Sequence, residues 1–548
     1  MNRNEYLHRL RTESFDLCII GGGASGAGCA LDAALRGLKV CLVEKTDFAA
    51  ETSSRSTKLI HGGVRYLEQA FKKLDFAQLR QVRHGLEERH ILLANAPHLA
   101  HPLPLLTPVF HWWEAWYYRI GLWLYDKFAA HKDQLPQSRY LTRAETLQRS
   151  PGLSTQLRGA VCYYDGQLDD ARYCLALIQS AAEAGAVVVN HALVHRFIHS
   201  ETGELEAAEI IDELAADGEN ASFRVEARAF LNCTGPAADH LRLLANPRLD
   251  KRIQASKGAH IVLPADLLPG SDALLIPKTA DGRVVFAVPF DGRVLVGTTD
   301  EPIPAQDEEP LADRDDLRFL LNTLQPYLAR PLPQSAVSAA FAGLRPLIKA
   351  GGGHATKRML RDHEVEHDPV SGLFSLMGGK WTTYRLMARD AVDAVCRQLQ
   401  HAGECRTADY KLAGAARYLP GIWREIQLVT GLDEPICRHL EWRYGVRAME
   451  LVNLAVEAPA LAQALHPGWP FIGAEVVWAA RNEMACTLRD VLARRVRLEI
   501  ADWQAVEAVI EPVSKLLARE LGWDEAHRRE ETSRYRALLQ SFRATLFA

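Results

Sequence analysis

The sequence predicts an α/β protein, α+β over the whole chain, on three observations. A glycine-rich stretch near the N-terminus lies between two apolar, strand-like runs. Three further strand-like runs between residues 258 and 300 are separated by glycine or proline, a pattern typical of an antiparallel sheet. After about residue 400 the chain is rich in Ala, Leu, Glu and Arg, which is typical of helices.

The size and charge of the chain narrow its class. Its 548 residues are enough for two or three domains with a large core. Its formal net charge of −4 argues against a nucleic-acid-binding protein. The ten cysteines are scattered without a CxxC pair, which favours a reducing compartment and argues against a zinc or iron–sulfur site, so we expect no metal.

The sequence also bears on membrane topology. The first 16 residues contain no apolar segment of the kind found in signal peptides. Because no run of about 18 apolar residues occurs, we expect no membrane-spanning helix. These features predict a protein on the cytosolic side, either soluble or peripheral to a membrane.

The N-terminal glycines lie within a strand–turn–helix–strand pattern. The apolar run at 15–20 predicts a buried strand, 27–36 predicts a helix, and 40–44 predicts a second strand. This order around "GGGASG" is typical of a dinucleotide-binding unit and predicts a dinucleotide site. The pattern alone does not distinguish FAD from NAD.

Each glycine of this motif has an expected role. Gly21 makes the tight turn, Gly23 lets the backbone approach a pyrophosphate, and Gly26 permits close packing of helix against strand. Glu44, 18 residues after Gly26, is expected to accept hydrogen bonds from ribose hydroxyls. The residues of this unit predicted to bind the cofactor are Gly21, Gly22, Gly23, Ala24, Ser25, Gly26 and Glu44.

A hydroxyl-rich stretch, "ETSSRSTKLIHGG", follows this unit. It is either a polar surface loop or a bed of hydroxyls and glycine backbone beneath a ligand larger and flatter than nicotinamide. The strand-like run at 227–239 ends in "TGP" and is expected to return to the nucleotide-binding sheet and close over the cofactor. From these two stretches we predict cofactor contacts at Thr52, Ser53, Ser56, Lys58, Leu59, His61, Gly62, Gly63, Thr234 and Gly235.

Stretches along nearly the whole chain match the motifs of one enzyme family. "IIGGGASGAGCALDAALRG" and "GGKWTTYRLMA" resemble the two signature stretches of the FAD-dependent, respiratory glycerol-3-phosphate dehydrogenases. "TKLIHGGVRYLE", "SKGAHIVLP", "VGTTD" and "GLRPL" match it in the expected order, and "CTLRDVLARRVRL" resembles its C-terminal helical domain. One departure is "KLAGAARY", where the family usually has a double glycine entering that domain.

The resemblance implies a fold and a domain division. The fold is a glutathione-reductase-like Rossmann FAD domain of the D-amino-acid-oxidase superfamily, with an inserted antiparallel-sheet substrate domain and a C-terminal helical cap. The predicted segments are 14–90, 155–245 and 343–398 for the FAD-binding domain, 91–154 and 246–342 for the substrate domain, and 399–548 for the helical domain.

The resemblance also implies an activity. That activity is oxidation of sn-glycerol 3-phosphate to dihydroxyacetone phosphate, with hydride transfer from C2 to FAD N5 and electrons passed to a membrane quinone. The candidate phosphate ligands Arg65, Arg345 and Arg361 lie in or beside matched motifs. Tyr66 and Lys380 complete the predicted substrate-binding set. Which arginine holds the phosphate and which faces the reacting carbon stays open at this stage.

Proton abstraction from the substrate has three candidate residues. Histidine titrates near neutrality and suits this role. His260 would point from a strand into the substrate cavity, whereas His61 would chiefly shape the flavin bed. Lys380 is better suited to supply positive charge, because a lysine has a high pKa unless it is buried. The predicted catalytic set is therefore His260, His61, Lys380 and Arg345.

A second glycine corner, "MGGKWTTYRLMA" at residues 377–388, reads as a strand end, a glycine pair and a helix start. Reduced flavin carries negative charge around N1 and the C2 carbonyl, so a positive helix end there would stabilise it. The predicted contacts are Gly379, Lys380, Thr382 and Thr383, with either threonine capping the helix or bonding the ring. This second corner favours FAD over NAD.

An aromatic stretch at 110–128, "FHWWEAWYYRIGLWLYDKF", holds four of the eleven tryptophans. It is either an interfacial membrane contact through which quinone approaches, or core packing beneath the substrate domain. The arginine-rich C-terminal tail is a second candidate contact, although a cap helix is favoured there. From the resemblance we expect peripheral association with the inner face of the cytoplasmic membrane, and a homodimer.

Three other functions stay open. The first is a glycerol-3-phosphate oxidase that reduces O₂ on the same scaffold. The second is an amine or amino-acid oxidase of the same superfamily, which would need an arginine for a carboxylate but no arginine cluster for a phosphate. The third is a redox-silent flavoprotein scaffold, against which the presence of Lys380 and Arg345 counts.

Overall fold

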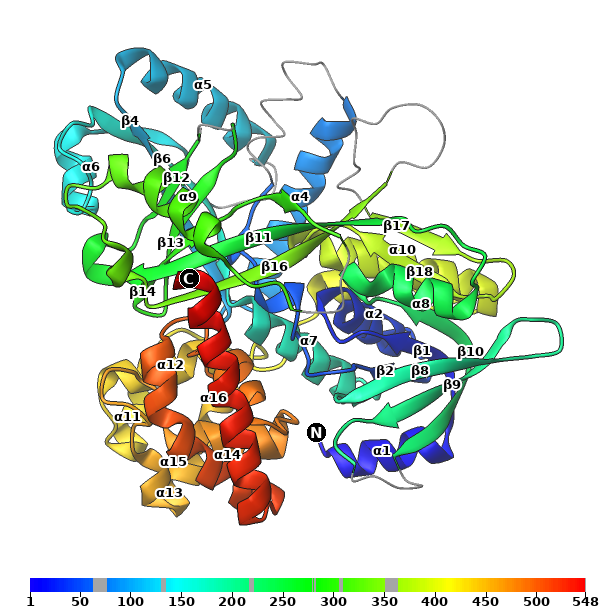
Figure 1. The fold of residues 1–548 in the computed structure, drawn as a ribbon. Coiled ribbons are helices and arrows are strands. Elements are labelled where there is room, and N and C mark those ends of the chain that lie inside the picture. Colours follow the sequence, from blue (N-terminus) through cyan, green and yellow to red (C-terminus); the bar gives the residue numbers. More distant parts are fainter. Residues whose placement is uncertain are drawn as a thin grey trace.

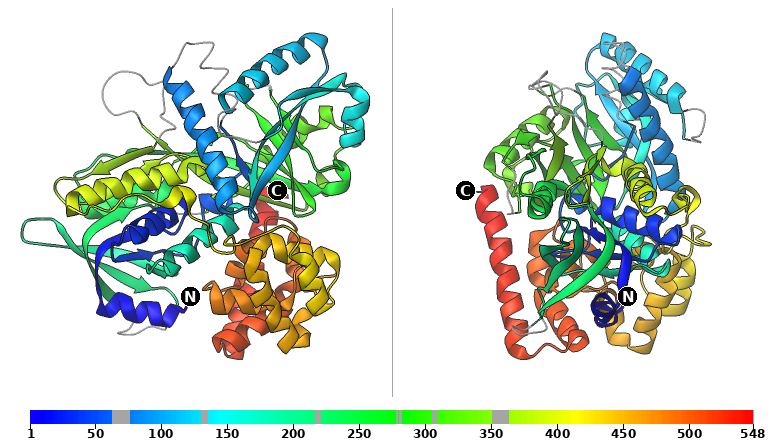
Figure 2. Two further views of the ribbon diagram at one scale, coloured as in Figure 1. Left: turned by 180° about the vertical axis from the view of Figure 1, so that it is seen from behind. Right: turned by 90° about the vertical axis from the view of Figure 1, so that its right-hand side faces the viewer.

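Two β-sheets and a group of C-terminal helices make up the fold (Figure 1). The structure is a computed structural model, and it describes residues 1–62, 76–129, 135–215, 221–277, 279, 282–304, 309–349 and 363–547. In the views of Figures 1 and 2 the C-terminal helices, coloured orange to red, lie at the end of the molecule opposite helix α5.

The first sheet contains the predicted dinucleotide-binding unit. β1 (Ser14–Ile20) and β2 (Val40–Val43) pair in parallel, and α2 (Ala24–Leu35) connects them. β10 (Ser222–Asn232) pairs in parallel with the other side of β1, and β18 (Phe374–Gly378) pairs in parallel with β10. The strand predicted at 227–239 therefore returns to this sheet as expected.

The remaining strands extend the sheet on both sides, in the order β17-β18-β10-β1-β2-β7, with β9 and β8 following β10 by antiparallel pairing. Their bounds are β7 (Val187–Val189), β8 (Ala192–His199), β9 (Leu205–Asp212) and β17 (His363–His367).

Alternate residues of the central strand enter cores on opposite faces of this sheet. Leu17 and Ile19 pack with residues of α2, α7 (Asp170–Glu183) and α10 (Tyr384–Leu399). Cys18 and Ile20 pack on the opposite face, with residues of α1 (Arg3–Thr12) and α8 (Ala238–Ala245). Apolar residues on both faces are what a buried parallel sheet requires.

The second sheet is largely antiparallel, as the turn-separated strand runs predicted. β11 (Ile253–Pro264) lies between β14 (Arg293–Gly297) and β16 (Ala339–Ile348), and β13 (Val285–Phe290) pairs with β14. The other strands are β3 (Leu59–Ile60), β4 (Ala100–Val109), β5 (Arg139–Thr142), β6 (Gly159–Leu168), β12 (Ala273–Ile276) and β15 (Glu301–Pro302).

Some strands cross the domain boundaries that the sequence predicts. β3 and β6 lie in segments predicted for the FAD-binding domain, and β16 runs across the boundary predicted at 343, yet all three pair within the second sheet. The second sheet therefore includes strands from segments that the sequence assigned to the FAD-binding domain. The division itself stays a prediction.

The chain after residue 400 is helical, as predicted. The apolar face of α16 buries Tyr535, Leu539, Phe542 and Leu546, so the C-terminal tail packs as a cap helix. Its bounds and those of its neighbours are α11 (Trp423–Thr430), α12 (Glu434–Tyr444), α13 (Ala448–Glu457), α14 (Gly473–Asn482), α15 (Trp503–Leu521) and α16 (Glu525–Phe547).

Four more helices border the second sheet or connect it to the first. They are α4 (Phe76–Asn95), α5 (Trp112–Ala129), α6 (Arg143–Arg149) and α9 (Arg314–Leu324). In the part of the chain that the structure describes, no helix is both long and apolar enough to span a bilayer.

Candidate functional site

The glycine loop has the geometry that its motif predicts. Gly21 has a φ of +111°, a conformation that favours glycine. A Cβ atom at Gly26 would lie 1.9 Å from the Gly21 carbonyl oxygen, so only glycine lets α2 begin this close to the end of β1. A Cβ atom at Gly23 would lie 2.8 Å from Ser53 Oγ, so the backbone is also bare where the next loop approaches.

Glu44 fixes the glycine loop from the end of β2. Its Oε2 accepts a hydrogen bond from the Gly22 N–H (2.6 Å), and its Oε1 accepts one from the Thr46 N–H (2.9 Å). Burial raises the pKa of this carboxyl, and the two N–H donors act in the opposite direction. The ribose contact expected of Glu44 stays a prediction.

The hydroxyl-rich loop joins three parts of the site and is not a free surface loop. Thr52 Oγ1 donates to the Leu344 carbonyl (2.7 Å), and Ser53 Oγ accepts from the Ala24 N–H at the start of α2 (2.9 Å). The Ser53 carbonyl accepts from Trp381 Nε1 (2.9 Å). This loop therefore contacts the glycine loop, β16 and the second glycine corner at once, which supports the interpretation as a cofactor bed.

The second glycine corner reaches the first one. Gly378 and Gly379 have φ angles of +72° and +81°, and a 3₁₀ turn, η6 (Trp381–Thr383), comes before α10. Thr383 is the N-cap residue of α10, but its side chain makes no capping hydrogen bond, because its hydroxyl donates to the Lys380 carbonyl (3.3 Å); a bond of either threonine to the ring stays a prediction. Thr382 is buried within the turn.

An acidic residue that we did not predict supports the hydroxyl-rich loop from below. Asp170 Oδ2 accepts hydrogen bonds from Ser56 Oγ (2.7 Å) and Lys58 Nζ (2.8 Å). Lys58 is completely buried, and burial lowers its pKa to about 7 against the opposing effect of Asp170. The Lys58 ammonium thus lies beneath the loop, and the cofactor contact predicted for this residue stays a prediction.

The sequence carried no signal that could have identified Asp170. It lies in the first turn of α7, directly after the N-cap Asp169, where an acidic residue is already expected for helix stability. Only the fold brings this turn under residues that lie more than a hundred positions earlier.

His260 lies at the interface between the loop and the second sheet. Its Nε2 is 2.9 Å from Thr57 Oγ1, and its ring stacks on Phe341 of the neighbouring strand at 4.9 Å between centroids. Burial lowers its pKa well below the usual value, and the positive charges of Lys58 and Arg345 lower it further. The imidazole is therefore neutral. Its Nδ1 is buried and has no hydrogen-bond partner in the described part of the chain.

Arg345 is held by the loop that follows β14. Its guanidinium donates to Asp300 Oδ1 (3.1 Å), Thr298 Oγ1 (3.0 Å) and the Thr299 carbonyl (3.1 Å). A Cβ atom at Gly258 would lie 2.6 Å from Arg345 Nη2, so the glycine on β11 leaves room for the guanidinium. Thr298, Thr299 and Asp300 lie in the "VGTTD" motif, whose sequence alone does not indicate a role in orienting Arg345.

The end of β10 lies against the glycine loop, and its closure over the cofactor stays a prediction. The Thr234 hydroxyl donates to Asn232 Oδ1 (2.7 Å), and Gly235 has a φ of +56°. A Cβ atom at Gly21 would lie 2.7 Å from the Cys233 carbonyl oxygen, which shows how closely the two segments approach.

The remaining predicted residues fall into two groups. His61 lies with its ring centroid 6.4 Å from that of Phe286, and Leu59 pairs with Gln167 in β3. The residues outside the described part of the chain are Gly63, Arg65, Tyr66 and Arg361. Among the described residues, no group of three or more His, Cys, Asp or Glu side chains is arranged to hold a metal ion.

Comparisons with known proteins agree with this geometry. Residues 16–393 match the family described as FAD dependent oxidoreductase, and residues 405–528 match the C-terminal domain of alpha-glycerophosphate oxidase. The mitochondrial glycerol-3-phosphate dehydrogenase of Homo sapiens is 39% identical over 539 residues, covering 96% of this chain and 73% of its own length. That of Arabidopsis thaliana is 39% identical over 557 residues, covering 97% of this chain and 87% of its own.

The chain belongs to the FAD-dependent glycerol-3-phosphate dehydrogenase family. A solved glycerol-3-phosphate dehydrogenase of Bacillus halodurans, complexed with FAD, superposes with a TM-score of 0.80 at 29% identity, over 98% of this chain and 97% of its own. As a member of the glycerol-3-phosphate dehydrogenase family, this chain is an FAD-dependent oxidoreductase, and both the predicted fold and the predicted cofactor are confirmed.

The residues present suit FAD. The backbone at Gly23 is bare where a pyrophosphate would approach, and the hydroxyls of Thr52, Ser53 and Thr57 line the same loop. The second corner, absent from a simple dinucleotide unit, is tied to this loop through Trp381. The residues that would hold FAD are thus those predicted at the two glycine corners and the loop between them.

Proposed function

We propose that this chain oxidises sn-glycerol 3-phosphate to dihydroxyacetone phosphate. The observation that carries the proposal is the juxtaposition of Arg345 and His260 on adjacent strands of the second sheet, both attached to the FAD-binding loop. Thr57 bonds His260, and Thr52 bonds the carbonyl of the residue before Arg345. A cation and a neutral base beside the cofactor bed are what this reaction needs, and the named relatives support the substrate.

Arg345 is the proposed ligand of the substrate phosphate. Asp300 and Thr298 hold its guanidinium in one orientation, which lowers the entropy lost when a substrate binds. Arg65 and Arg361 are proposed as further phosphate ligands from their motifs. A phosphate dianion is well matched by guanidinium groups, which donate paired hydrogen bonds.

His260 is the proposed base for the C2 hydroxyl proton. A neutral imidazole has a ring nitrogen that accepts a proton, and the hydrogen bond to Thr57 fixes the orientation of the ring. Bound FAD would supply the acceptor for the hydride that leaves C2. Lys380 and the second glycine corner are proposed to stabilise negative charge at the cofactor's pyrimidine edge.

We propose that α5 is the membrane contact through which a quinone approaches. Trp112, Trp113, Trp116 and Trp123 are 70%, 55%, 60% and 52% exposed, so core packing does not account for them. Arg119 lies over the Trp116 ring at 5.7 Å and supplies a basic group among the aromatics. Exposed tryptophans with a basic residue favour the bilayer interface. Peripheral attachment at the inner face of the cytoplasmic membrane and a homodimer stay predictions of the family resemblance.

Anaerobic reduction tests the proposed activity. The purified holoprotein is mixed with glycerol 3-phosphate without oxygen while absorbance near about 450 nm, a general property of oxidised flavin, is recorded. Bleaching supports the substrate assignment, and its absence overturns it. Reoxidation of the bleached protein by a quinone analogue and not by oxygen supports a dehydrogenase, whereas rapid reoxidation by oxygen identifies an oxidase.

Two matched substrates test the alternatives. Glycine and sarcosine should leave the flavin oxidised, because neither carries a phosphate for the arginines. Bleaching by either would favour the amine or amino-acid oxidase alternative. A flavin that responds to none of these compounds but is reduced by dithionite would favour the redox-silent scaffold.

A further inference from the structure

Three arginines of the C-terminal helical domain lie beneath two FAD-binding loops, the hydroxyl-rich loop and the loop that carries Glu44. They form a run at residues 494–497, at the end of a π-helical turn, η10 (Asp490–Arg495). Arg494, Arg495 and Arg497 are only 6%, 1% and 1% exposed. We infer that this run is a positioning element that fixes both FAD-binding loops, so that the helical domain shapes the cofactor site without touching the cofactor. The inference rests on the proposed function only for the assignment of these loops to FAD.

Arg497, the last arginine of the run, supports the hydroxyl-rich loop; we call it the first arm, and Arg494 with Arg495 the second arm. Arg497 Nη2 donates to Asp170 Oδ1 (2.7 Å) and to the Ser54 carbonyl (2.9 Å). The other carboxylate oxygen of Asp170 accepts from the N–H (3.0 Å) and Oγ (2.7 Å) of Ser56 and from Lys58 Nζ. Asp170 is completely buried, so the arginine and the loop share one carboxylate away from solvent.

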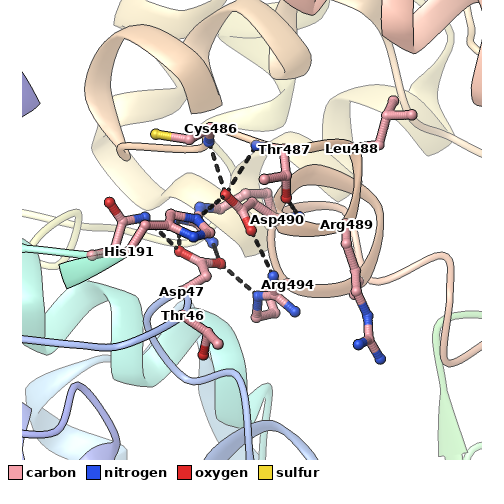
Figure 3. Close-up of polar contacts among 12 residues, drawn as sticks. Thr46, Asp47, His191, Cys486, Thr487, Leu488, Arg489, Asp490 and Arg494 are labelled. Atoms are coloured by element: carbon pink, nitrogen blue, oxygen red, sulfur yellow. Dashed lines mark hydrogen bonds and ion pairs between the residues drawn. The ribbon is translucent and has the colours of Figure 1, made fainter. Parts of the chain in front are cut away.

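The second arm supports the loop that carries Glu44. Arg495 donates from Nη1 and Nη2 to the two carboxylate oxygens of Asp47 (2.6 and 2.9 Å), three residues after Glu44. Arg494 Nε donates to Asp47 Oδ2 (2.5 Å), as Figure 3 shows. Glu44 in turn holds the Gly22 N–H of the glycine loop. Two hydrogen-bonded contacts, joined by the short stretch of chain from Glu44 to Asp47, therefore lead from the helical domain to the proposed pyrophosphate site.

A second acid keeps this arm in place. Asp490 Oδ1 accepts from Arg494 Nη2 (2.6 Å), and its Oδ2 accepts from the backbone N–H groups of Cys486 and Thr487 and lies 2.9 Å from His191 Nε2 (Figure 3). The His191 N–H donates to the Thr46 carbonyl, in the loop between Glu44 and Asp47. The Glu44 loop is thus held both by its side-chain acid and by its backbone.

Because these ion pairs are buried, each arginine restricts the position of the carboxylate that it contacts. A buried guanidinium without its carboxylate partner is strongly unfavourable, so each arginine must place its acid within hydrogen-bonding distance. Two of those acids lie outside the helical domain: Asp47 in the Glu44 loop, and Asp170 in the first turn of α7, where it bonds the hydroxyl-rich loop, whereas Asp490 lies within the helical domain. Residues that contact a ligand are held precisely only when a supporting layer of hydrogen bonds locks them. The run at 494–497 supplies that layer for two separate loops.

FAD release and flavin potential test the inference in the holoprotein. FAD release on dilution is followed by flavin fluorescence, and the reduction potential is measured by dye equilibration. Arg497→Met should weaken FAD binding by at least about tenfold, the change that loss of one charge-assisted hydrogen bond corresponds to. It should also shift the flavin potential. Arg481→Met, which removes an arginine paired with Glu520 on the surface of the same domain, should change neither.

The conservative variant keeps the test valid if Arg497→Met does not fold. Arg497→Lys retains the charge but cannot donate to Asp170 and Ser54 with the same geometry. It is combined with Ser56→Ala, which removes one loop contact to Asp170. If both act through Asp170, the double variant should release FAD less than the product of the two single effects predicts.

Two results would overturn the inference. One is an Arg497→Met protein with wild-type far-UV circular dichroism, FAD release and flavin potential. The other is strict multiplication of the single effects in the double variant. Neither measurement uses glycerol 3-phosphate, so failure of the wild-type protein to oxidise that compound would count against the proposed function and leave this inference standing.

Discussion

Arg345 combines two properties that a substrate-binding cation needs. Its side chain is 30% exposed, so one part of it faces outward, and its guanidinium is nonetheless fixed by Asp300 and Thr298. An arginine on an open surface would have neither its orientation fixed nor a glycine opposite to make room for it. The pairing with Asp300 is therefore better explained as orientation than as stabilisation of the fold.

Replacing Arg345 tests whether this residue is an oriented ligand of the substrate. Arg345→Met should raise KM and lower kcat/KM by at least about 30-fold, because a charged, oriented contact to the substrate is lost. Steady-state kinetics with glycerol 3-phosphate and an artificial acceptor measure the effect. Arg330→Met, at an exposed ion pair with Asp266 near the same sheet, is the matched control. An unchanged kcat/KM in Arg345→Met would remove this arginine from the substrate site.

His260 gives a pH dependence of known sign. Its pKa in the folded protein lies well below the usual value of 6.5, so the imidazole stays neutral and active as pH falls to about 6.5. We expect kcat/KM to stay level down to that pH and to fall only below it, as the base becomes protonated. His260→Gln should lower kcat by about 10² or more and abolish this acid limb. An acid limb that persists in His260→Gln would assign the base to another residue.

At the scale of elements, the two glycine corners form one unit. The first corner begins α2 and the second leads through a 3₁₀ turn to α10, and the helices pack together where Gly28 meets Tyr384. A Cβ atom at Gly28 would lie 2.8 Å from the Tyr384 ring, so the close approach depends on glycine. Lys380 lies on the connecting turn, at the N-cap of η6.

The second glycine corner is predicted to affect the rate of flavin reduction more than the affinity for FAD. Lys380→Ala should slow flavin reduction by substrate more than it weakens FAD binding, because the charge acts on the reduced state and the backbone of the corner remains. Stopped-flow absorbance gives the rate, and FAD fluorescence on dilution gives the binding. Lys515→Ala, an exposed lysine of α15, serves as the control. An unchanged rate of reduction would refute the role of Lys380.

Helix α5 predicts a membrane affinity that can be removed without disturbing the core. Trp112, Trp113 and Trp116 are largely exposed, so replacing them by Ser should leave the flavin spectrum and thermal unfolding unchanged. Co-sedimentation with vesicles of bacterial polar lipids should fall by at least about tenfold. Replacing exposed Leu428 and Trp442 of the helical domain by Ser is the control for general hydrophobicity. Equal sedimentation of both variants would assign the membrane contact elsewhere.

At the scale of the whole molecule, buried ion pairs join the helical domain to the first sheet. Glu483, at the end of α14, accepts two hydrogen bonds from Arg172 of α7 (2.7 and 2.9 Å), and both residues are buried. Burial acts to raise the pKa of Glu483, but the Arg172 charge lowers it below its usual value overall. The pair therefore stabilises the fold above the unfolded-state pKa of a glutamate, and this contribution is lost as pH falls through the lower folded-state value.

Removing one charge of this pair should destabilise the whole chain. Glu483→Gln leaves the Arg172 guanidinium buried beside a neutral group, which costs about 3 kcal/mol in the free energy of unfolding. Urea titration followed by circular dichroism, with flavin fluorescence as a second probe, measures it. Glu520→Gln, at the exposed pair with Arg481, should cost less than about 1 kcal/mol. Equal effects of the two variants would show that burial does not govern the interface.

The sequence was informative where function depends on local pattern. The spacing of Gly21, Gly23 and Gly26 predicted the turn, the helix and the sheet neighbours, since short-range sterics and strand periodicity decide them. The expected helix began three residues late, at 27 and not at Ala24, because the extended Gly23 already serves as its N-cap. The sequence at 377–388 likewise predicted a strand end, a glycine pair and a helix start, which the structure has, and the cofactor contact of this corner stays a prediction.

The hydrogen-bond partners of the predicted residues could not be predicted from local sequence patterns. Asp170 and Arg497 bond one another across more than three hundred residues of sequence, and each has an ordinary local explanation as a helix-terminal acid or a basic residue of a helical segment. The aromatic stretch at 110–128 fitted both a buried and an exposed helix, because periodicity does not reveal which neighbours cover it. The tertiary structure shows that the tryptophans of this helix are exposed, because the second sheet and α4 pack against its other side.

The sequence by itself therefore determined the FAD-binding unit, the family and the residues predicted to line the site, because these depend on spacing over short stretches. The tertiary structure decided how those residues are oriented: Arg345 by Asp300, His260 by Thr57, and the cofactor loops by Asp170, Asp47 and the arginines at 494–497. The physical reason is that a hydrogen bond between two side chains constrains both partners wherever they lie in the chain, and only folding brings such partners within reach of one another.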